Sequence, residues 1–350
     1  MTAADIRVTR EVFEQAAEPA GEPDVELARV YRSGLHEGTH HGALVITDRD
    51  GSVLWKRGDV HRPVFHRSCA KPFQAVAMLD AGLPLSGPRL ALAAASHSGE
   101  AAHVAGILSM LADAGLTEDD LGCPADLPAD QAARDKVIRA GGAARRVYMN
   151  CSGKHAAMVQ TCRINGWSTA DYLDPKHPLQ QAVRVVVETA TGAATHPTVG
   201  VDGCGAPVFA TDLAGLARGF GSLVTAEPGT SARAVADAMR RHPYLVGGTN
   251  SGDTLLMTGI EGLLVKLGAD GVQAFALPDG RAAAFKISDG ADRARLPIVL
   301  AALEFLGIST ESVASSTAAV TARTVFGGGR PVGTVTAAPN LFHEVASRQI

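Results

Sequence analysis

A serine and a lysine stand three residues apart in the segment Ser68-Cys69-Ala70-Lys71, which Pro72 follows. On a helical turn this spacing places both side chains on one face, and Pro72 is typical of a first helical turn. The free N–H groups at a helix start favour negative charge. A desolvated lysine with a lowered pKa can accept the serine proton at neutral pH, so the pair can replace Ser-His in nucleophilic catalysis. Because S-x-x-K occurs by chance in many proteins, the pattern alone does not establish catalysis.

Two further segments could complete such a site. Lys266 lies in the strand-like run LLVKLGADG and, taken alone, is most simply a solvated edge-strand lysine. Together with the first motif, however, it gives the combination of S-x-x-K and a later K-x-G that occurs in class A β-lactamases and their relatives. Ser96 begins Ser96-His97-Ser98-Gly99-Glu100, in which Ser98 or Ser96 with Glu100 can cap the following helix. Ser96 is not needed for that cap and is therefore freer to act in chemistry.

Cysteine and lysine recur in two Gly-rich turns, Asn150–His155 and Val201–Gly205. Cys151 and Lys154 are one turn apart at a predicted helix start, and polar turns of this kind tend to carry function. A zinc site of Cys151, Cys204 and His155 is one interpretation. The spacing does not match a standard zinc module, however, so buried unreactive cysteines are favoured on spacing alone.

The elements that must position these residues follow one another as strands, many helices, then strands and a helix. GALVIT and SVLWKRG, on either side of the turn at Asp48–Gly51, predict a hairpin. A helix is predicted from Ser68 to Gly82. Strands return in GLLVKLGADG and AAAFKIS, and the tail TVFGGGRPVGTVTA predicts a further hairpin. Helical patterns cover 100–115, 129–141, 153–164, 177–191, 211–219, 229–241 and 292–306.

This order predicts an α+β fold in which an antiparallel sheet is assembled from both ends of the chain around an α-helical middle region. We expect residues 1–25 to be a loosely held leader. The sheet region with its flanking helix would comprise 26–67 and 245–350, and the mainly helical region 68–244.

Composition narrows the function further. The chain has 350 residues, a formal net charge of −4 and a hydrophobic fraction of 46%, which indicates an ordinary globular protein and argues against a nucleic-acid binder. It shows no apolar run of about 18 residues and no secretory signal, so we expect no membrane partner. Five scattered cysteines indicate reduced thiols and a cytoplasmic location. No P-loop or dinucleotide fingerprint occurs, so no organic cofactor is expected. A homodimer is the common default for a soluble enzyme of this size.

Taken in order, the motifs resemble the class 3 asparaginases, the Rhizobium etli type also labelled asparaginase II. The resemblance covers roughly residues 27–337. The matching segments are GLHEGTHHGALVITD, FHRSCAKPFQA, LALAAASHSGE, MNCSGKHAAM, HPLQQAV, VDGCGAPVF, RRHPYLVGGTNSGDTLLM, VKLGADGV and the tail GGGRPVGTVT.

The resemblance implies a fold like that of serine β-lactamases and glutaminases, and hydrolysis of L-asparagine to L-aspartate and ammonia. It implies two Ser-Lys pairs, Ser68 with Lys71 and Ser96 with Lys266. It also implies a metal site, with zinc as its ion, at three positions that this sequence retains: Cys151, Lys154 and Cys204.

Charge and neighbourhood suggest how substrate is held. Arg67 could pair with the substrate carboxylate as Arg forks do, Asp202 with the α-ammonium, and His155 could orient either group. Ser68 is the expected nucleophile, with Ser96 in that role as the alternative.

Two positions depart from the family pattern: Asp253 replaces a cysteine, and Ser98 replaces an asparagine. A carboxylate in place of a thiol could change metal affinity or local pKa values, so substrate preference is less closely determined than fold. The competing functions are a glutaminase or another amide or β-lactam acyl-transferase on the same fold, and a non-enzymatic metal- or thiol-responsive amino-acid-binding protein. An inactive structural homologue is a further alternative, against which the retention of both Ser-Lys pairs argues.

Overall fold

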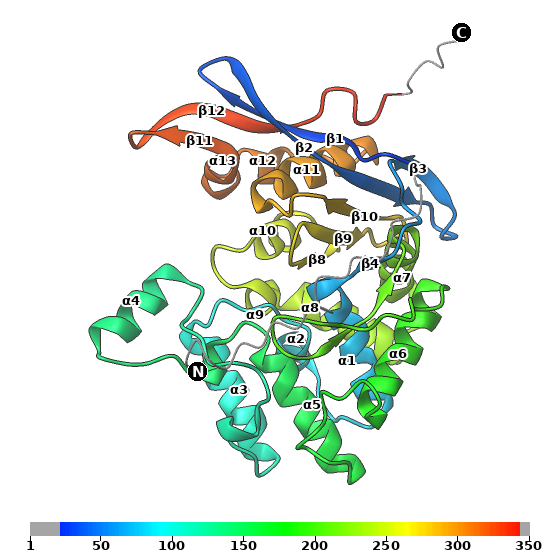
Figure 1. Cartoon of the computed structure of the whole chain (residues 1–350), viewed down its shortest axis with the longest axis vertical. Helices are drawn as coiled ribbons and strands as arrows, with labels where there is room; N and C mark the ends of the chain where they lie inside the picture. The colour runs from blue at the N-terminus through cyan, green and yellow to red at the C-terminus, as the bar shows by residue number, and fades with distance from the viewer. Residues whose placement is uncertain (1–21, 344–350) are drawn as a thin grey trace, which may run out of the picture.

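One antiparallel sheet, built from both ends of the chain, organises the molecule (Figure 1). The structure is a computed structural model and describes residues 22–343. The sheet runs in the order β11-β12-β1-β2-β10-β9-β8, with β3 paired to β2. Its strands are β1 (Val25–Arg32), β2 (Leu35–Thr47), β3 (Val53–Arg57), β8 (Leu264–Gly268), β9 (Val272–Ala276), β10 (Ala282–Ile287), β11 (Thr324–Gly327) and β12 (Arg330–Ala337). Two small pairs, β4 (Val64–Phe65) with β7 (Ala210–Thr211) and β5 (Gly200–Val201) with β6 (Pro207–Val208), lie apart from it.

Helices fill the middle of the chain and return near its end. The first group is α1 (Lys71–Asp80), α2 (Gly87–Ala93), α3 (Ala101–Asp113), α4 (Gln131–Arg139), α5 (Ser152–Asn165), α6 (Pro178–Thr191), α7 (Leu213–Thr225), α8 (Ser231–Arg241), α9 (Pro243–Gly247) and α10 (Gly252–Gly259). The second is α11 (Arg295–Phe305), α12 (Glu311–Ala314) and α13 (Thr317–Arg323). The predicted α+β class, with a sheet from both ends and a helical middle, is confirmed. The expected leader lies, up to residue 21, outside the described residues.

Most strongly periodic segments form the elements that their patterns predict. The hairpin of β2 with β3 and the tail hairpin of β11 with β12 both form. The helix expected from Ser68 begins instead as a 3-10 turn over Arg67–Ala70, and α1 follows at Lys71. Strand β9 and helices α2, α9, α10, α12 and α13 were not predicted. These helices have eight residues or fewer, and a run that short carries little periodicity.

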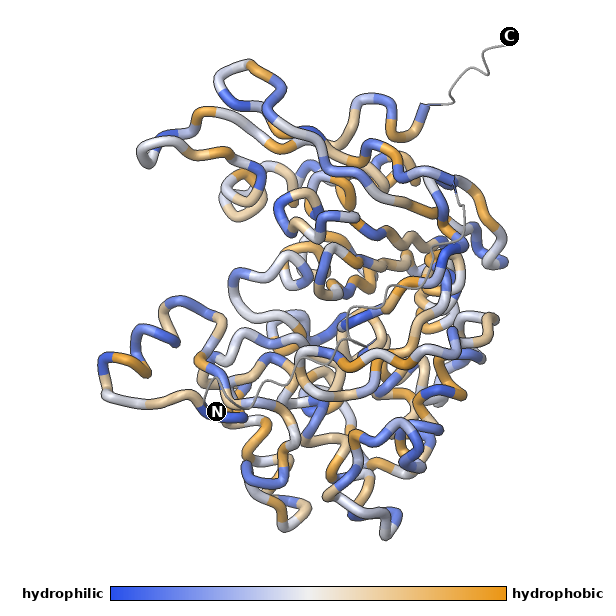
Figure 2. The backbone as a smooth tube through the Cα atoms, in the orientation of Figure 1, coloured by the Kyte–Doolittle hydropathy of each residue, from blue (hydrophilic) through white to orange (hydrophobic). Residues whose placement is uncertain are grey.

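The core lies where the sheet meets the helical region. Helix α7 packs on β2, β9 and β10, whereas α11 packs on β1 and β12. Helix α5 is enclosed by α1, α2 and α3, and every residue from Ser152 to Cys162 is buried. Figure 2 shows the contrast with α4, a hydrophilic helix that projects from the body and has no buried residue. Among the described residues, no helix has the length and apolar character needed to cross a membrane.

At Gly42 on β2, the neighbouring strand β10 approaches so closely that there is no room for a Cβ atom. A Cβ at this position would lie 1.9 Å from the Lys286 carbonyl oxygen, a backbone atom that cannot move aside cheaply. We expect Gly42→Ala to destabilise the fold by about 1–3 kcal/mol, because the added methyl overpacks the sheet. Gly38→Ala, on the same strand but with open space around its Cβ, should change stability by no more than about 0.5 kcal/mol. Urea unfolding midpoints measure both, and equal midpoints would contradict this packing argument.

Candidate active site

Lys71 is the buried base candidate, and it contacts Ser96. It is the first residue of α1 and 1% exposed. Its Nζ donates to the Ala95 carbonyl oxygen at 2.5 Å and to Ser96 Oγ at 2.8 Å. Within residues 22–343, no hydrogen bond joins Lys71 to the Ser68 hydroxyl. The lysine of the first predicted pair thus touches the serine of the second.

The surroundings of Lys71 favour its neutral form. Burial lowers the pKa of Lys71, Cys151 opposes this effect, and the charges of Lys266 and Lys154 lower the pKa further. A lysine of this kind can accept a proton near neutral pH. Among the described residues, its two hydrogen-bond acceptors are a carbonyl and a hydroxyl without formal charge, and Cys151 is the group that favours its charged form.

Ser68 sits in a strained turn just before α1. It is 8% exposed and follows Arg67, whose φ of 51° is in the left-handed region that non-glycine residues rarely adopt. The Arg67 side chain holds this turn, because its Nε donates to Asp202 Oδ1 at 2.8 Å and its Nη1 donates to Asp270. Strain maintained by surrounding contacts is concentrated at functional sites, so the turn is a candidate for presenting the serine.

Arg67 and Asp202, both expected to bind substrate, are therefore paired with each other. Burial raises the pKa of Asp202, but the Arg67 hydrogen bond and the Lys154 charge outweigh this effect and lower the pKa below its ordinary value. Asp270, a partner that sequence reasoning missed, also has a positive φ, at 53°. Its signal in the sequence was the Asp-Gly turn that ends LLVKLGADG, but the partner across the fold could not be read from it.

Lys266 is fully buried and bound to Asp253. Its Nζ donates to Asp253 Oδ2 at 3.1 Å and to the Leu267 carbonyl oxygen at 3.1 Å. The Lys266 and Asp253 side chains are 0% and 2% exposed. Among the described residues, no hydrogen bond joins Lys266 to Ser96. The departure at position 253 thus supplies the partner of this lysine.

Two cysteines and a lysine converge beside Lys71. The Lys154 ammonium lies 3.0 Å from Cys204 Sγ, and all three residues of the implied metal set are buried. Hydrogen bonding to Cys204 lowers the pKa of Cys151 well below its ordinary value, although burial opposes this effect. Burial lowers the pKa of Lys154, but the charges of Cys204 and Cys151 outweigh this effect and raise the pKa above its ordinary value. The two cysteine sulfurs are donors that zinc takes, whereas the Lys154 nitrogen could join them only after losing its proton, so the set fits the ion in that deprotonated form.

His155 belongs to the wall of this cluster. Its Nδ1 is 2.6 Å from the Tyr172 hydroxyl, and its buried Nε2 has no hydrogen-bond partner among the described residues. Burial lowers the pKa of His155 to about 4, so it is neutral. Within residues 22–343, no three His, Cys, Asp or Glu side chains are placed to share a metal ion. The alternative zinc set of Cys151, Cys204 and His155 is therefore not assembled.

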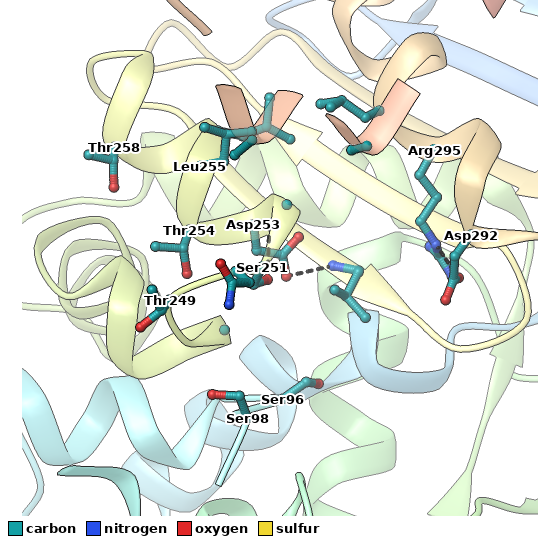
Figure 3. Close-up of a pocket in the computed structure, with 18 of the residues that line it drawn as sticks. Ser96, Ser98, Thr249, Ser251, Asp253, Thr254, Leu255, Thr258, Asp292 and Arg295 are labelled. Carbon is teal, nitrogen blue, oxygen red and sulfur yellow. Dashed lines mark hydrogen bonds and ion pairs between the residues drawn. The ribbon is translucent and has the colours of Figure 1, made fainter. Parts of the chain in front are cut away.

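Two cavities flank these residues. One of about 730 Å³ is lined by Ser96 and Asp253, and in Figure 3 Ser96 and Ser98 face Asp253 and Ser251 across it. The other, of about 750 Å³, is lined by Arg67. Ser68 lines neither of the two. Among the candidate residues, Ser96 and Asp253 therefore border the first cavity and Arg67 borders the second.

Glu100 fastens the loop that borders the first cavity. Its carboxylate accepts from the Thr249 N–H at 2.9 Å, from Thr249 Oγ1 at 2.8 Å, from Ser98 Oγ at 2.6 Å and from the Tyr244 hydroxyl at 3.2 Å. Burial raises the pKa of Glu100, but these hydrogen bonds outweigh this effect and lower the pKa below its ordinary value. Glu100 itself caps α3, so the expected cap by Ser98 is wrong. The serine instead donates to the capping residue.

Comparisons with known proteins give one family and several distant structures. A sequence model of the L-asparaginase II family matches residues 28–337. A search of curated proteins found no match. A β-lactamase from Mycobacterium bovis gives a TM-score of 0.42 at 19% identity and covers 75% of this chain and 94% of that chain. EstCE1, a hydrolase with promiscuous acyltransferase activity, gives a TM-score of 0.34 at 13% identity and covers 75% of this chain and 88% of that chain. Mglu, in its tris and glutamate form, gives a TM-score of 0.36 at 16% identity and covers 83% of this chain and 63% of that chain.

The Glu100 contacts predict how the loop at Thr249 responds to a single change. We expect Glu100→Gln to speed amide hydrogen exchange at 248–251 by at least about tenfold, because an amide accepts at one atom where the carboxylate accepts at two. Glu261→Gln, at an exposed position, is the matched control and should leave exchange unchanged. Exchange measured by mass spectrometry decides the point, and equal rates in the two variants would show that Glu100 does not hold the loop.

Proposed function

Because the chain belongs to the L-asparaginase II family and is therefore a hydrolase acting on amides, we propose that it converts L-asparagine and water to L-aspartate and ammonia. The match over residues 28–337 covers nearly all the motifs on which the resemblance was drawn. The observation that carries the proposal is the buried Lys71, whose pKa is lowered by burial and which lies 2.8 Å from Ser96 and three residues after Ser68.

In the proposed reaction, Ser68 Oγ attacks the side-chain amide carbon while Lys71 takes up the hydroxyl proton. The carbon–oxygen bond forms, and the carbonyl electron pair moves to oxygen. Backbone N–H groups at the start of the Ser68 helix and on β8 would stabilise that oxyanion. The carbon–nitrogen bond then breaks, and ammonia leaves with a proton that Lys71 returns through Ser96. Water cleaves the β-aspartyl ester by the reverse proton path.

A second assignment exchanges the two serines. Ser96 lines the first cavity and is the serine that Lys71 contacts directly. With Ser96 as nucleophile, Ser68 would assist. Both assignments use the same base, so only a covalent intermediate distinguishes them.

Recognition of the substrate is proposed for the ion pair of Arg67 and Asp202. Their opposite charges lie 2.8 Å apart, and they suit the carboxylate and the α-ammonium of an amino acid. His155 is bound to Tyr172 and neutral, so we assign it to orienting the wall around Cys204 rather than to contacting a charged group.

Zinc is the proposed metal, held by Cys151, Lys154 and Cys204. When bound, it would supply Lewis-acid polarisation beside the site. The lowered pKa of Cys151 and the closeness of Lys154 to Cys204 support this assignment. We also propose a cytoplasmic homodimer without an organic cofactor. The five cysteines are all free thiols in the structure, as a reducing compartment requires.

The proposed catalysis is tested by ammonia release from L-asparagine and, separately, from L-glutamine. We expect release from asparagine that falls at least about a thousandfold in Ser68→Ala and in Lys71→Met, because each removes a group that acts in the transition state. Ser222→Ala, which removes a hydroxyl bonded only within α7, should keep full activity.

Mass spectrometry of the quenched reaction then identifies the nucleophile. An acyl adduct on the peptide that contains Ser68 supports the first assignment, and one on Ser96 supports the second. No ammonia from asparagine with a folded wild type would contradict the proposed function. Faster ammonia release from glutamine than from asparagine would instead indicate a glutaminase. Turnover of nitrocefin would indicate an acyl-transferase on the same fold.

The proposed metal site is tested by elemental analysis. We expect about one zinc per chain after reconstitution, and loss of that zinc in Cys204→Ser, because a hydroxyl is a poor substitute for a thiolate ligand. Cys162→Ser changes a buried cysteine of α5 and should keep the metal. Equal zinc in both variants, or none in the wild type, would exclude this ligand set.

A further inference from the structure

A buried ion pair joins helix α10 to strand β8 at the wall of the first cavity. Lys266 Nζ donates to Asp253 Oδ2 at 3.1 Å, and the two side chains are 0% and 2% exposed. Ions removed this completely from water persist only while each compensates the other. Removing either partner would therefore leave the other charge buried and uncompensated.

The Asp253 carboxylate is fixed from several directions. Its Oδ2 also accepts from the Leu267 N–H at 3.0 Å, and its Oδ1 accepts from the Gln273 amide at 3.4 Å. Asp253 is the second residue of α10, where the positive end of the helix dipole favours a carboxylate. Helix α10 and strands β8 and β9 thus all hold it in place.

The same contacts occupy the Lys266 ammonium. Its second acceptor is the carbonyl oxygen of Leu267, on its own strand, at 3.1 Å. The ammonium thus has one charged and one uncharged acceptor, and both are fixed within the fold. This is the opposite of the setting of Lys71, whose acceptors are a carbonyl and a hydroxyl.

We propose that Asp253 is a positioning residue that holds Lys266 as a fixed cation behind the cavity wall, so that Lys266 acts through its charge rather than as a proton acceptor. The inference rests on the proposed amide hydrolysis, in which negative charge develops on the amide oxygen. A cation fixed in advance within a dry interior stabilises such charge more strongly than one in water. Asp253 and Ser96 line the same cavity, Lys266 lies behind Asp253, and its charge acts on Lys71, which contacts Ser96.

Two substitutions of Lys266 separate the roles. Lys266→Arg keeps the charge at every accessible pH but cannot accept a proton, whereas Lys266→Met removes the charge. We expect Lys266→Arg to retain kcat within about tenfold of wild type and Lys266→Met to lose about a hundredfold. A folded Lys266→Arg as inactive as Lys266→Met would overturn the inference.

A double-mutant cycle tests whether Asp253 acts through Lys266. We expect Asp253→Asn to lower kcat at least about tenfold while KM stays within about threefold. The double variant Asp253→Asn/Lys266→Met should match Lys266→Met within about twofold in kcat. A further independent loss in the double variant would show that Asp253 acts on the substrate itself. A wild-type kcat in Asp253→Asn would likewise overturn the positioning role.

Stability is separated from chemistry by a control ion pair. Asp237→Asn breaks the pairing with Arg240 on α8 and should lower the unfolding temperature without changing kcat. If Asp253→Asn does not fold, the double variant, which leaves no unpaired charge, and Lys266→Arg carry the test. The wild type is assayed alongside the variants. If the wild type releases ammonia and none of these substitutions changes the rate, the inference is overturned but the proposed function is not. No release from wild type overturns the proposed function, and the inference falls with it.

Discussion

Three lysine side chains are buried almost completely beside one another, and the rest of the site depends on how each charge is satisfied. Lys71, Lys154 and Lys266 are 1%, 1% and 0% exposed. A buried ammonium without a partner is unstable, so each needs its own solution. Lys71 has uncharged oxygens and a lowered pKa, Lys154 has the thiols of Cys151 and Cys204 and a raised pKa, and Lys266 has the carboxylate of Asp253. Three identical side chains are thereby held in three different electrostatic environments.

The fold brings these lysines together from distant parts of the chain, on α1, α5 and β8. Close approach of backbone is what allows this. At Gly153, next to Lys154, a Cβ would lie 2.4 Å from the Leu92 carbonyl oxygen, and at Gly268 one would lie 2.7 Å from the His66 carbonyl oxygen. Larger residues at these two positions would push α5 away from α2, and β8 away from the turn that carries Ser68. The sheet from both chain ends is therefore what lets Lys266 approach Lys71.

The sequence allows the elements to be predicted better than the contacts. The turn at Asp48–Gly51, the periodic helices and the ordered motifs carry local signals, and they suffice for the α+β class and for the family. Pairings across the fold have no local signal. S-x-x-K places Lys71 near Ser68, yet the ammonium bonds to Ser96, because the path of the chain after α2 brings Ala95 and Ser96 to it. Asp253 stood out as a departure from the family pattern, but only packing shows that it faces Lys266.

The ion pair of Arg67 and Asp202 connects the strained turn at Ser68 to the thiol cluster. Arg67 holds the turn through Asp202 and Asp270, and the Asp202 carboxylate is in turn held ionised by Arg67 and by the charge of Lys154. An amino acid bound to this pair as proposed adds a carboxylate beside Arg67 and an ammonium beside Asp202, so it redistributes the charge that Lys154 experiences. Lys154 also contacts Cys204, so the charges of Arg67, Asp202, Lys154 and Cys204 form one connected set.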